Sequence, residues 1–126
     1  EKACRRAGLD YWPRLAPSEH KDWDDFLRTT GADPDRLHLF TTKASRPVWD
    51  ARIRRGDHLV FGKETRGLPS DLLERYPHRL VTLPLLPGER SLNVANAACA
   101  AVYEAMRQMC ARGEMTLSEN ARIDLR

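Results

Sequence analysis

The chain has 126 residues and a mass of 14.4 kDa, which is room for one domain of ordinary size. Hydrophobic residues make up 41% and charged residues 31%, a balance typical of a globular protein and not of a disordered chain. The net charge is +3, without the block of like charges that would mark a nucleic-acid-binding tail. No apolar run approaches the roughly 18 residues that span a bilayer and no signal peptide opens the sequence, so we expect neither a membrane nor a secreted protein.

Cysteine usage indicates a reducing compartment. The three cysteines, Cys4, Cys99 and Cys110, form no C-x-x-C pair. The last two are eleven residues apart in a predicted helix, which separates them by about 16 Å, too far for a disulfide within that helix. We therefore expect a cytoplasmic protein.

The first elements along the chain are a helix and a strand. Ser18 is a candidate N-cap for a helix that ends at Gly31, because apolar residues recur at helical spacing between them. The Asp-Pro-Asp sequence at residues 33–35 favours a turn. A strand is predicted over residues 37–42.

Two further strands and a short helix follow. Basic residues alternate with apolar ones over residues 46–55, which we interpret as an excursion over the surface. Residues 58–62 are a short apolar run typical of a buried parallel strand. A short helix is predicted over residues 69–76 and a third strand over residues 80–83.

The strongest helical pattern covers residues 93–112, before a polar tail that begins after Gly113. The apolar residues that follow one stripe of this helix, and that we expect to face the core, are Ala95, Ala98, Cys99, Val102, Met106 and Met109. Strands that alternate with helices predict an α/β domain with a mostly parallel sheet flanked by helices. A sheet of three strands has two open edges, so a second copy or further sequence is expected to complete it.

Several common sites are absent from the sequence. There is no G-x-G-x-x-G dinucleotide motif, and Gly62-Lys63 lacks both the lead-in and the Ser or Thr of a phosphate-binding P-loop. The four histidines are scattered, with no partner at metal-ligand spacing. We therefore expect no metal site.

Two loops that follow strands are the candidates for a site. In residues 61–69 a glycine at the end of a strand lets a ligand approach the backbone, although a tight turn with an exposed ion pair explains the same residues equally well. Residues 83–93 deliver Ser91 and Asn93 to the start of a helix. There they serve as caps or bind a polar ligand.

These two loops resemble motifs of the SPOUT methyltransferases, trefoil-knotted α/β enzymes that use S-adenosyl-L-methionine. The second motif of that family is similar to LVFGKETRGLP at residues 59–69, and the third to LPLLPGERSLNVANA at residues 83–97. Residues 5–11 and 39–43 resemble the small members that methylate the wobble cytidine or uridine of tRNA. The similarity extends to about Arg112.

The resemblance implies a SPOUT domain over residues 1–112 with a C-terminal knot, followed by a polar tail at residues 113–126. It implies a cytoplasmic homodimer that transfers a methyl group from S-adenosyl-L-methionine to a ribose 2′-hydroxyl of tRNA, at cytidine 34 or uridine 34. Family members carry a first motif, with an arginine proposed to assist the ribose hydroxyl, in a segment that the sequence as given does not contain. An inactive remnant that binds cofactor or RNA is therefore an alternative, as is 2′-O-methylation at another tRNA or rRNA site.

The same resemblance assigns candidate site residues. Those that match the cofactor pocket are Phe40, Thr41, Gly62, Leu83 and Ser91, with Phe40 and Leu83 on the two faces of the adenine. Those that match polar positions near the reacting groups are Glu64 and Asn93. The candidate RNA-binding residues are Arg5, Arg6 and Tyr103. The alanine-rich last helix is expected to contribute to the dimer interface.

Overall fold

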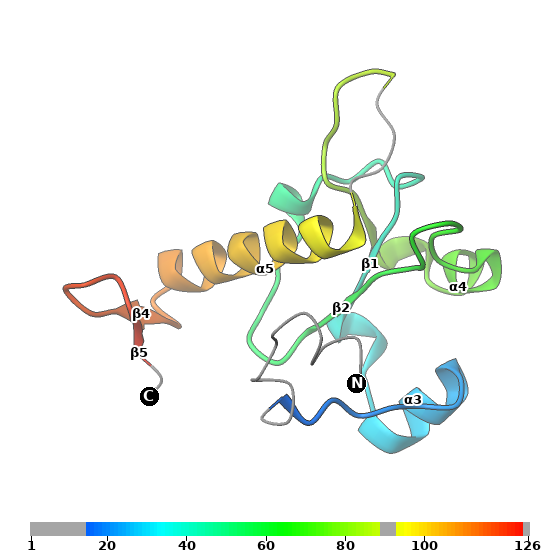
Figure 1. Cartoon of the computed structure of the whole chain (residues 1–126), viewed down its shortest axis with the longest axis horizontal. Coiled ribbons are helices and arrows are strands. Elements are labelled where there is room, and N and C mark those ends of the chain that lie inside the picture. Colours follow the sequence, from blue (N-terminus) through cyan, green and yellow to red (C-terminus); the bar gives the residue numbers. More distant parts are fainter. Residues whose placement is uncertain (1–14, 89–92, 125–126) are drawn as a thin grey trace, which may run out of the picture. The chain divides into compact units, whose positions relative to one another are not determined.

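The structure is a computed structural model that describes residues 15–88 and 93–124. The chain divides into two compact units, residues 1–32 and residues 33–126 (Figure 1). The predictions for Arg5, Arg6 and Ser91 lie outside the described residues.

The described part of the first unit contains one helix, α3 (Trp23–Thr30). Asp22 is its N-cap, because a side-chain oxygen of Asp22 accepts a hydrogen bond of 2.8 Å from the backbone N–H of Asp25. The helix ends at Gly31, whose φ of 63° is left-handed, as the sequence predicted. The predicted cap at Ser18 was wrong, because acidic residues that stabilise a helix N-terminus follow Asp22 directly.

The second unit is built on a three-stranded parallel sheet with the strand order β2-β1-β3. The central residue Leu39 pairs with Val60 on one side and with Leu80 on the other. The strands are β1 (Leu37–Phe40), β2 (His58–Val60) and β3 (Leu80–Val81). The predicted α/β class with a parallel sheet is confirmed, and each strand begins at the predicted residue but ends earlier.

Helices and a hairpin complete the second unit (Figure 1). The α-helices are α4 (Ser70–Arg75) and α5 (Val94–Ala111), and the 3-10 turns are η1 (Pro34–Arg36), η2 (Val48–Asp50) and η3 (Pro77–Arg79). Where a polar tail was expected, β4 (Thr116–Leu117) and β5 (Ile123–Asp124) form an antiparallel hairpin. The apolar Leu117 and Ile123 pair across it, which favours the strand conformation.

The core lies between α5 and one face of the sheet. Its buried members are Phe40, Val48, Ala51, Ile53, Val81, Ala101 and Ala105. Because side chains alternate along a strand, Leu37 and Leu39 are on the opposite face from Phe40, and both are fully buried there. Burial on both faces explains why β1, the central strand, is a continuous apolar run apart from His38.

The basic segment over residues 46–55 belongs to the core and is not a surface excursion. Val48, Ala51 and Ile53 have exposed fractions of only 1%, 2% and 2%. The backbone N–H of Val48 donates a hydrogen bond of 2.8 Å to the carbonyl of Thr82, so the segment extends the sheet beyond β3. The prediction was wrong because the exposed arginines of the segment, Arg52, Arg54 and Arg55, alternate with or follow apolar residues that turn inward.

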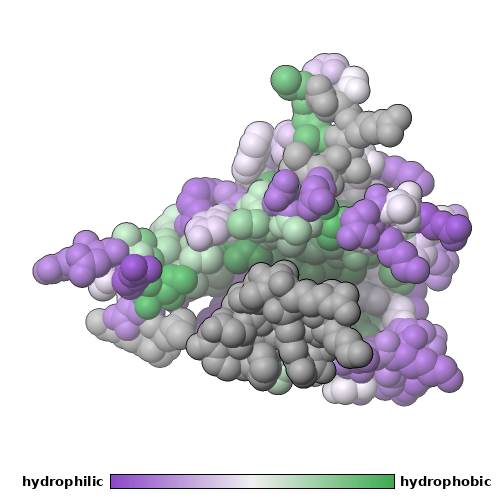
Figure 2. All heavy atoms as spheres, in the orientation of Figure 1, coloured by the Kyte–Doolittle hydropathy of each residue, from purple (hydrophilic) through white to green (hydrophobic). Residues whose placement is uncertain are grey.

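The face of α5 that packs on the sheet also differs from the prediction. The buried residues are Ala101, Ala105 and Gln108, and Met109 packs against the core as predicted, while Ala95 and Cys99 are exposed and Val102 is 44% exposed. Small side chains let the helix approach the sheet closely, and that closeness outweighs the hydropathy of the larger residues. Figure 2 shows the result as apolar surface along α5.

Candidate functional site

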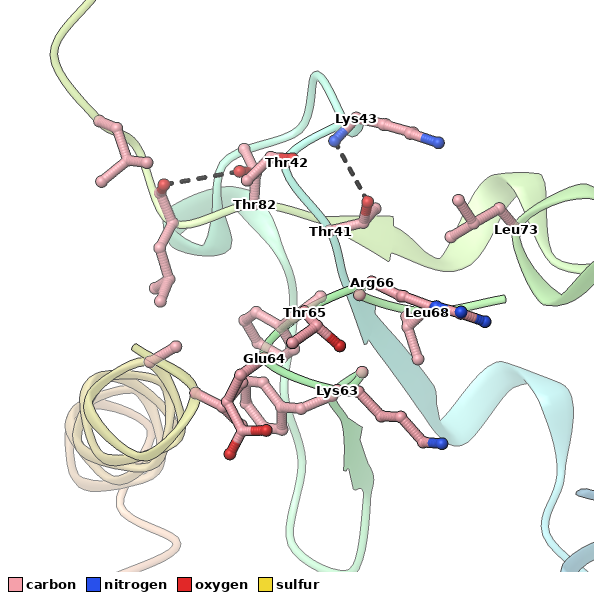
Figure 3. Close-up of a pocket in the computed structure, with 18 residues that line it drawn as sticks. Thr41, Thr42, Lys43, Lys63, Glu64, Thr65, Arg66, Leu68, Leu73 and Thr82 are labelled. Carbon is pink, nitrogen blue, oxygen red and sulfur yellow. Dashed lines mark hydrogen bonds between the residues drawn. The ribbon is translucent and has the colours of Figure 1, made fainter. Parts of the chain in front are cut away.

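A cavity of about 250 Å³ lies at the carboxyl ends of the three parallel strands (Figure 3). This is the edge at which open α/β sheets bind ligands. Four segments at the ends of the strands and the start of α5 line it, residues 40–43, 61–68, 82–85 and 94–97, together with Leu73 of α4.

Most of the residues predicted for the cofactor pocket come together here. Phe40, Thr41, Gly62, Glu64 and Leu83 all line the cavity, although they come from three separate loops. Lining residues that the sequence analysis did not assign are Thr42, Lys43, Phe61, Lys63, Thr65, Arg66, Gly67, Leu68, Leu73, Thr82, Leu85, Val94 and Ala97. For all but Leu73, Val94 and Ala97, which lie on helices, the position after a strand was the signal that could have identified them. Asn93 and Tyr103 do not line the cavity.

The loop after β2 closes tightly on itself at Gly62. The backbone N–H of Gly67 donates a hydrogen bond of 2.8 Å to the carbonyl of Lys63. A Cβ atom on Gly62 would lie 1.9 Å from the carbonyl carbon of Gly67 and 2.2 Å from the backbone nitrogen of Leu68. The closed loop therefore requires glycine at position 62. This reason differs from the one that the sequence suggested, which was close approach of a ligand to the backbone.

An aromatic pair forms one wall of the cavity. The rings of Phe40 and Phe61 are stacked, with centroids 4.7 Å apart and planes inclined by 14°. Phe40 is 8% exposed and belongs to the core, against which Leu83 also packs. One face of the Phe40 ring is thus covered by Phe61, and the expected adenine sandwich between Phe40 and Leu83 is not preformed.

The turn after β1 is held by hydrogen bonds of Thr41, whose carbonyl accepts from the backbone N–H of Ala44 at 3.3 Å. The backbone N–H of Thr41 donates to the carbonyl of Val81 at 2.9 Å, which continues the pairing of β1 with β3. Its side-chain oxygen accepts from the backbone N–H of Lys43 at 3.2 Å (Figure 3). The hydroxyl hydrogen of Thr41 is left available to donate to a ligand.

The charged groups around the cavity are mixed. Lys43, Lys63 and Arg66 contribute three cations, whereas Glu64 is the one carboxylate among the lining residues. In Figure 3 the Glu64 side chain is directed away from the ammonium groups of Lys43 and Lys63. A single carboxylate among cations is a strong hydrogen-bond acceptor for a hydroxyl or an ammonium group of a ligand.

Asn93 caps α5 at the edge of the cavity, next to the lining residue Val94. Its side-chain oxygen accepts hydrogen bonds from the backbone N–H groups of Ala95 at 2.8 Å and Asn96 at 3.3 Å. Because the oxygen is engaged by the helix, the NH₂ group of the same amide is turned away from the first turn. The cap thereby orients a hydrogen-bond donor.

Gln108 is a buried polar residue that the sequence analysis did not single out. Its side-chain oxygen accepts a hydrogen bond of 2.9 Å from the backbone N–H of Ile53, and its NH₂ group lies 3.5 Å from the carbonyl of Val48. The NH₂ group also donates to Glu104 at 3.1 Å. Gln108 thus fastens the segment around η2 to α5.

A buried ionic cluster lies at the amino ends of β1 and β2, away from the cavity. The carboxylate of Asp57 accepts hydrogen bonds from Arg36 at 2.9 Å, from the backbone of Arg54 at 2.8 Å, and contacts His38 Nε2 at 2.8 Å. Burial lowers the pKa of His38 despite this partner. Burial also opposes ionisation of Asp57, but the hydrogen bonds from His38, Arg54 and Arg36 outweigh it and lower the pKa of Asp57.

The described part of the chain shows neither a cluster of metal ligands nor a helix that could span a membrane. Within residues 15–88 and 93–124, no three His, Cys, Asp or Glu side chains gather as metal ligands would. In the same part of the chain, no helix has the length and apolar character needed to cross a bilayer.

The sequence of this chain is similar to those of known proteins. The model of the SpoU rRNA methylase family matches residues 1–103. A tRNA (cytidine(34)-2′-O)-methyltransferase of Burkholderia ambifaria is 49% identical over 105 residues, covering 82% of this chain and 67% of the relative. The enzyme of the same name from Escherichia coli K12 is 41% identical over 110 residues, covering 86% of this chain and 69% of the relative.

Two solved structures have the same fold. A Bacillus anthracis protein classed as an RNA methyltransferase superposes with a TM-score of 0.77 at 28% identity, covering 86% of this chain and 69% of its own. A structure described as giving insights into 2-OH methylation of cytidine or uridine 34 on tRNA superposes with a TM-score of 0.75 at 39% identity, covering 85% and 68%. With the family model matching most of its length, the chain belongs to the SpoU rRNA methylase family, and its resemblance to the SPOUT methyltransferases is confirmed.

Proposed function

We propose that this chain is an enzyme that transfers a methyl group from S-adenosyl-L-methionine to the 2′-hydroxyl of a tRNA ribose, at cytidine 34 or uridine 34. The observation that carries the proposal is the cavity at the carboxyl ends of β1, β2 and β3, where the two motif loops meet. The names of relatives that are 49% and 41% identical support the same reaction and the same nucleotide.

The residues present suit an adenosine-type cofactor. Apolar walls from Phe61, Leu68 and Leu83 match a flat base, while the Thr41 hydroxyl and the loop backbones offer hydrogen bonds to its edge. We assign Phe40, the buried partner of Phe61, to supporting this wall. When bound, S-adenosyl-L-methionine supplies an electrophilic methyl group on a sulfonium centre.

The chain's own contribution is mainly positioning. Gly62 permits the closed loop that presents Glu64 to the cavity. We propose that the Glu64 carboxylate accepts a hydrogen bond from the ribose hydroxyl and that the Asn93 amide donates one from the start of α5, so that the hydroxyl is aligned with the methyl group. Alignment alone supplies a large part of the rate of such a transfer. Ser91, outside the described residues, remains assigned to cofactor binding.

The active form is proposed to be a cytoplasmic homodimer, since tRNA is a cytoplasmic substrate. Cys99, Val102 and Tyr103 form an exposed apolar face on α5, with 44% of Val102 and 66% of Tyr103 accessible. A second copy would bury this face. Tyr103 is assigned to the tRNA surface at the edge of that interface, together with Arg5 and Arg6.

The test is transfer of tritiated methyl groups to bulk tRNA, followed by nuclease mapping of the label. Label on the ribose of nucleotide 34 supports the proposal. Label on rRNA, to which the family name points, or on another tRNA nucleotide would show that the proposed substrate is wrong and that the proposed reaction is right. A folded chain that binds the cofactor without turnover would instead establish a binding remnant.

Two variants of Asn93 separate its roles. Asn93→Ala removes both cap and donor and is expected to lose about 1 kcal/mol of stability together with most of the activity. Asn93→Asp keeps an oxygen for the helix cap but has no amide donor. Full activity in Asn93→Asp would show that the donor has no part in the reaction.

A further inference from the structure

Trp49 is the bulkiest exposed apolar side chain among the described residues. It lies on the 3-10 turn η2, and 63% of its surface is accessible. Val48 directly before it and Ala51 two positions after it are 1% and 2% exposed, while Asp50 between Trp49 and Ala51 is exposed. A turn anchored in the core at both ends holds the indole in solvent, because Val48 and Ala51 cannot turn outward without emptying the core.

The turn that carries Trp49 is fixed by hydrogen bonds at both ends. Within it, the backbone N–H of Asp50 donates to Pro47 at 3.0 Å and that of Ala51 to Val48 at 3.1 Å. On the far side, the Gln108 side chain holds the carbonyl of Val48 at 3.5 Å. The indole therefore loses little backbone freedom when it binds a partner, which favours tight contact.

This turn is adjacent to the proposed active site. Thr82 lines the cavity, and its carbonyl accepts a hydrogen bond of 2.8 Å from the backbone of Val48. Trp49 therefore directly follows Val48, whose backbone is hydrogen-bonded to the cavity residue Thr82. Trp49 does not itself line the cavity, and its turn is connected to the cavity through this hydrogen bond.

The segment that carries Trp49 is cationic. Between residues 43 and 52 the sequence has three cationic side chains, Lys43, Arg46 and Arg52, and one carboxylate, Asp50. Lys43 and Arg52 are exposed, whereas Arg54 and Arg55 lie further along, where the backbone of Arg54 donates to Asp57 at the amino ends of the strands. Exposed cations in the same segment as a rigid aromatic ring are a combination that binds single-stranded nucleic acid, whose phosphates meet the charges while a base stacks on the ring.

We propose that Trp49 is a stacking platform for an unpaired nucleobase of the RNA substrate, at a position outside the base of the methylated nucleotide. The inference rests on the proposed function for the identity of the polymer. A polyanion with exposed bases fits this segment better than an apolar protein face, because Lys43 and Arg52 would have to lose their water against such a face.

Fluorescence of the 126-residue chain tests the proposal directly. In a Trp12→Phe/Trp23→Phe background, Trp49 is the sole tryptophan. An RNA hairpin with a single-stranded loop should quench its emission in a saturable way, whereas a fully paired RNA of the same length should not. Because stacking is sequence-tolerant, hairpins with different loop sequences should quench alike.

Affinity measurements on variants give a second readout. Trp49→Ala should weaken hairpin binding roughly 5- to 150-fold, the range expected for loss of one base stack, and should raise the KM for tRNA with kcat little changed. Trp49→Tyr should retain most of the affinity. Leu117→Ala, which removes another exposed apolar side chain, 51% accessible, on the C-terminal hairpin, is the matched control and should bind as the parent does.

Absence of quenching, or hairpin affinity unchanged in Trp49→Ala, would overturn the proposal. A shift from dimer to monomer in Trp49→Ala, measured by sedimentation, would do the same by assigning the indole to a subunit interface. These outcomes are separate from the proposed function. A parent chain that quenches with RNA but transfers no methyl group would refute the enzyme assignment alone.

Discussion

Of the single methyl groups that could be added to the loop after β2, the one introduced by Gly62→Ala should damage the cavity most. The new Cβ would lie 1.9 Å from the carbonyl carbon of Gly67 and 2.2 Å from the nitrogen of Leu68. Both are backbone atoms, so no rotamer change relieves the clash and the loop has to open. Overpacking that forces the backbone to move costs about 3 kcal/mol, and opening the loop displaces Glu64 and the walls on either side of it.

Gly67→Ala is the matched control. A Cβ at Gly67 meets nothing within 4 Å, so the only cost is the left-handed backbone, with φ +67°, about 1–2 kcal/mol. Urea unfolding should therefore rank the variants with Gly62→Ala the less stable. Calorimetric titration with the demethylated cofactor should show at least a tenfold loss of affinity in Gly62→Ala and a smaller one in Gly67→Ala. Unchanged cofactor affinity in a folded Gly62→Ala protein would refute the assignment of this loop.

Three further predictions concern other parts of the chain. Gln108→Ala should lower the free energy of unfolding by about 1–3 kcal/mol, because the buried N–H of Ile53 loses its acceptor; an unchanged urea midpoint would contradict the role of Gln108. Burial lowers the pKa of His38 below its usual 6.5, so the folded state binds a proton on His38 less readily than the unfolded state does. The stability contributed by neutral His38 is therefore complete above pH 6.5 and falls as the pH drops below that value. A His38→Phe variant should therefore lose less stability than the parent between pH 7 and about pH 5, as followed by urea unfolding; equal losses would count against this explanation. Neutralising Arg5 and Arg6 should reduce the salt slope of tRNA binding by about 1–2 in filter-binding titrations without altering cofactor affinity, and an unaltered slope would remove both from the phosphate contacts.

The elements that the sequence predicted well are those whose signals are local. The strand predicted at residues 58–62 begins at His58, because a short apolar run between two turns is typical of a buried strand in a parallel sheet. The long helix predicted at residues 93–112 spans Val94–Ala111, and Asn93, one of the two capping residue types that the sequence offers there, is its N-cap. The position of the cavity was also predictable, since the ligand edge of a parallel sheet follows from its topology.

The features that the sequence did not predict depend on contacts between distant residues. Hydropathy placed Val102 on the inner face of α5, but Ala101 and Ala105 lie there because only small residues fit against the sheet at that distance. Gln108 has the character of a surface residue in sequence and is buried because its amide satisfies the backbone of Ile53, 55 positions earlier. The stack of Phe61 on Phe40 likewise needs the register of β1 and β2, which no local pattern specifies.

Helix α5 joins the two surfaces that the proposed reaction requires. Its first turn reaches the cavity through Val94, next to the amide donor of Asn93. Four turns later, Gln108 holds Val48 and Ile53, and with them the turn that presents Trp49. Because a helix is stiff along its axis, a displacement at either end is transmitted to the other. The distance between the methyl-transfer site and the proposed base platform is therefore set by one rigid element, which lets RNA bound at Trp49 be positioned relative to the cavity.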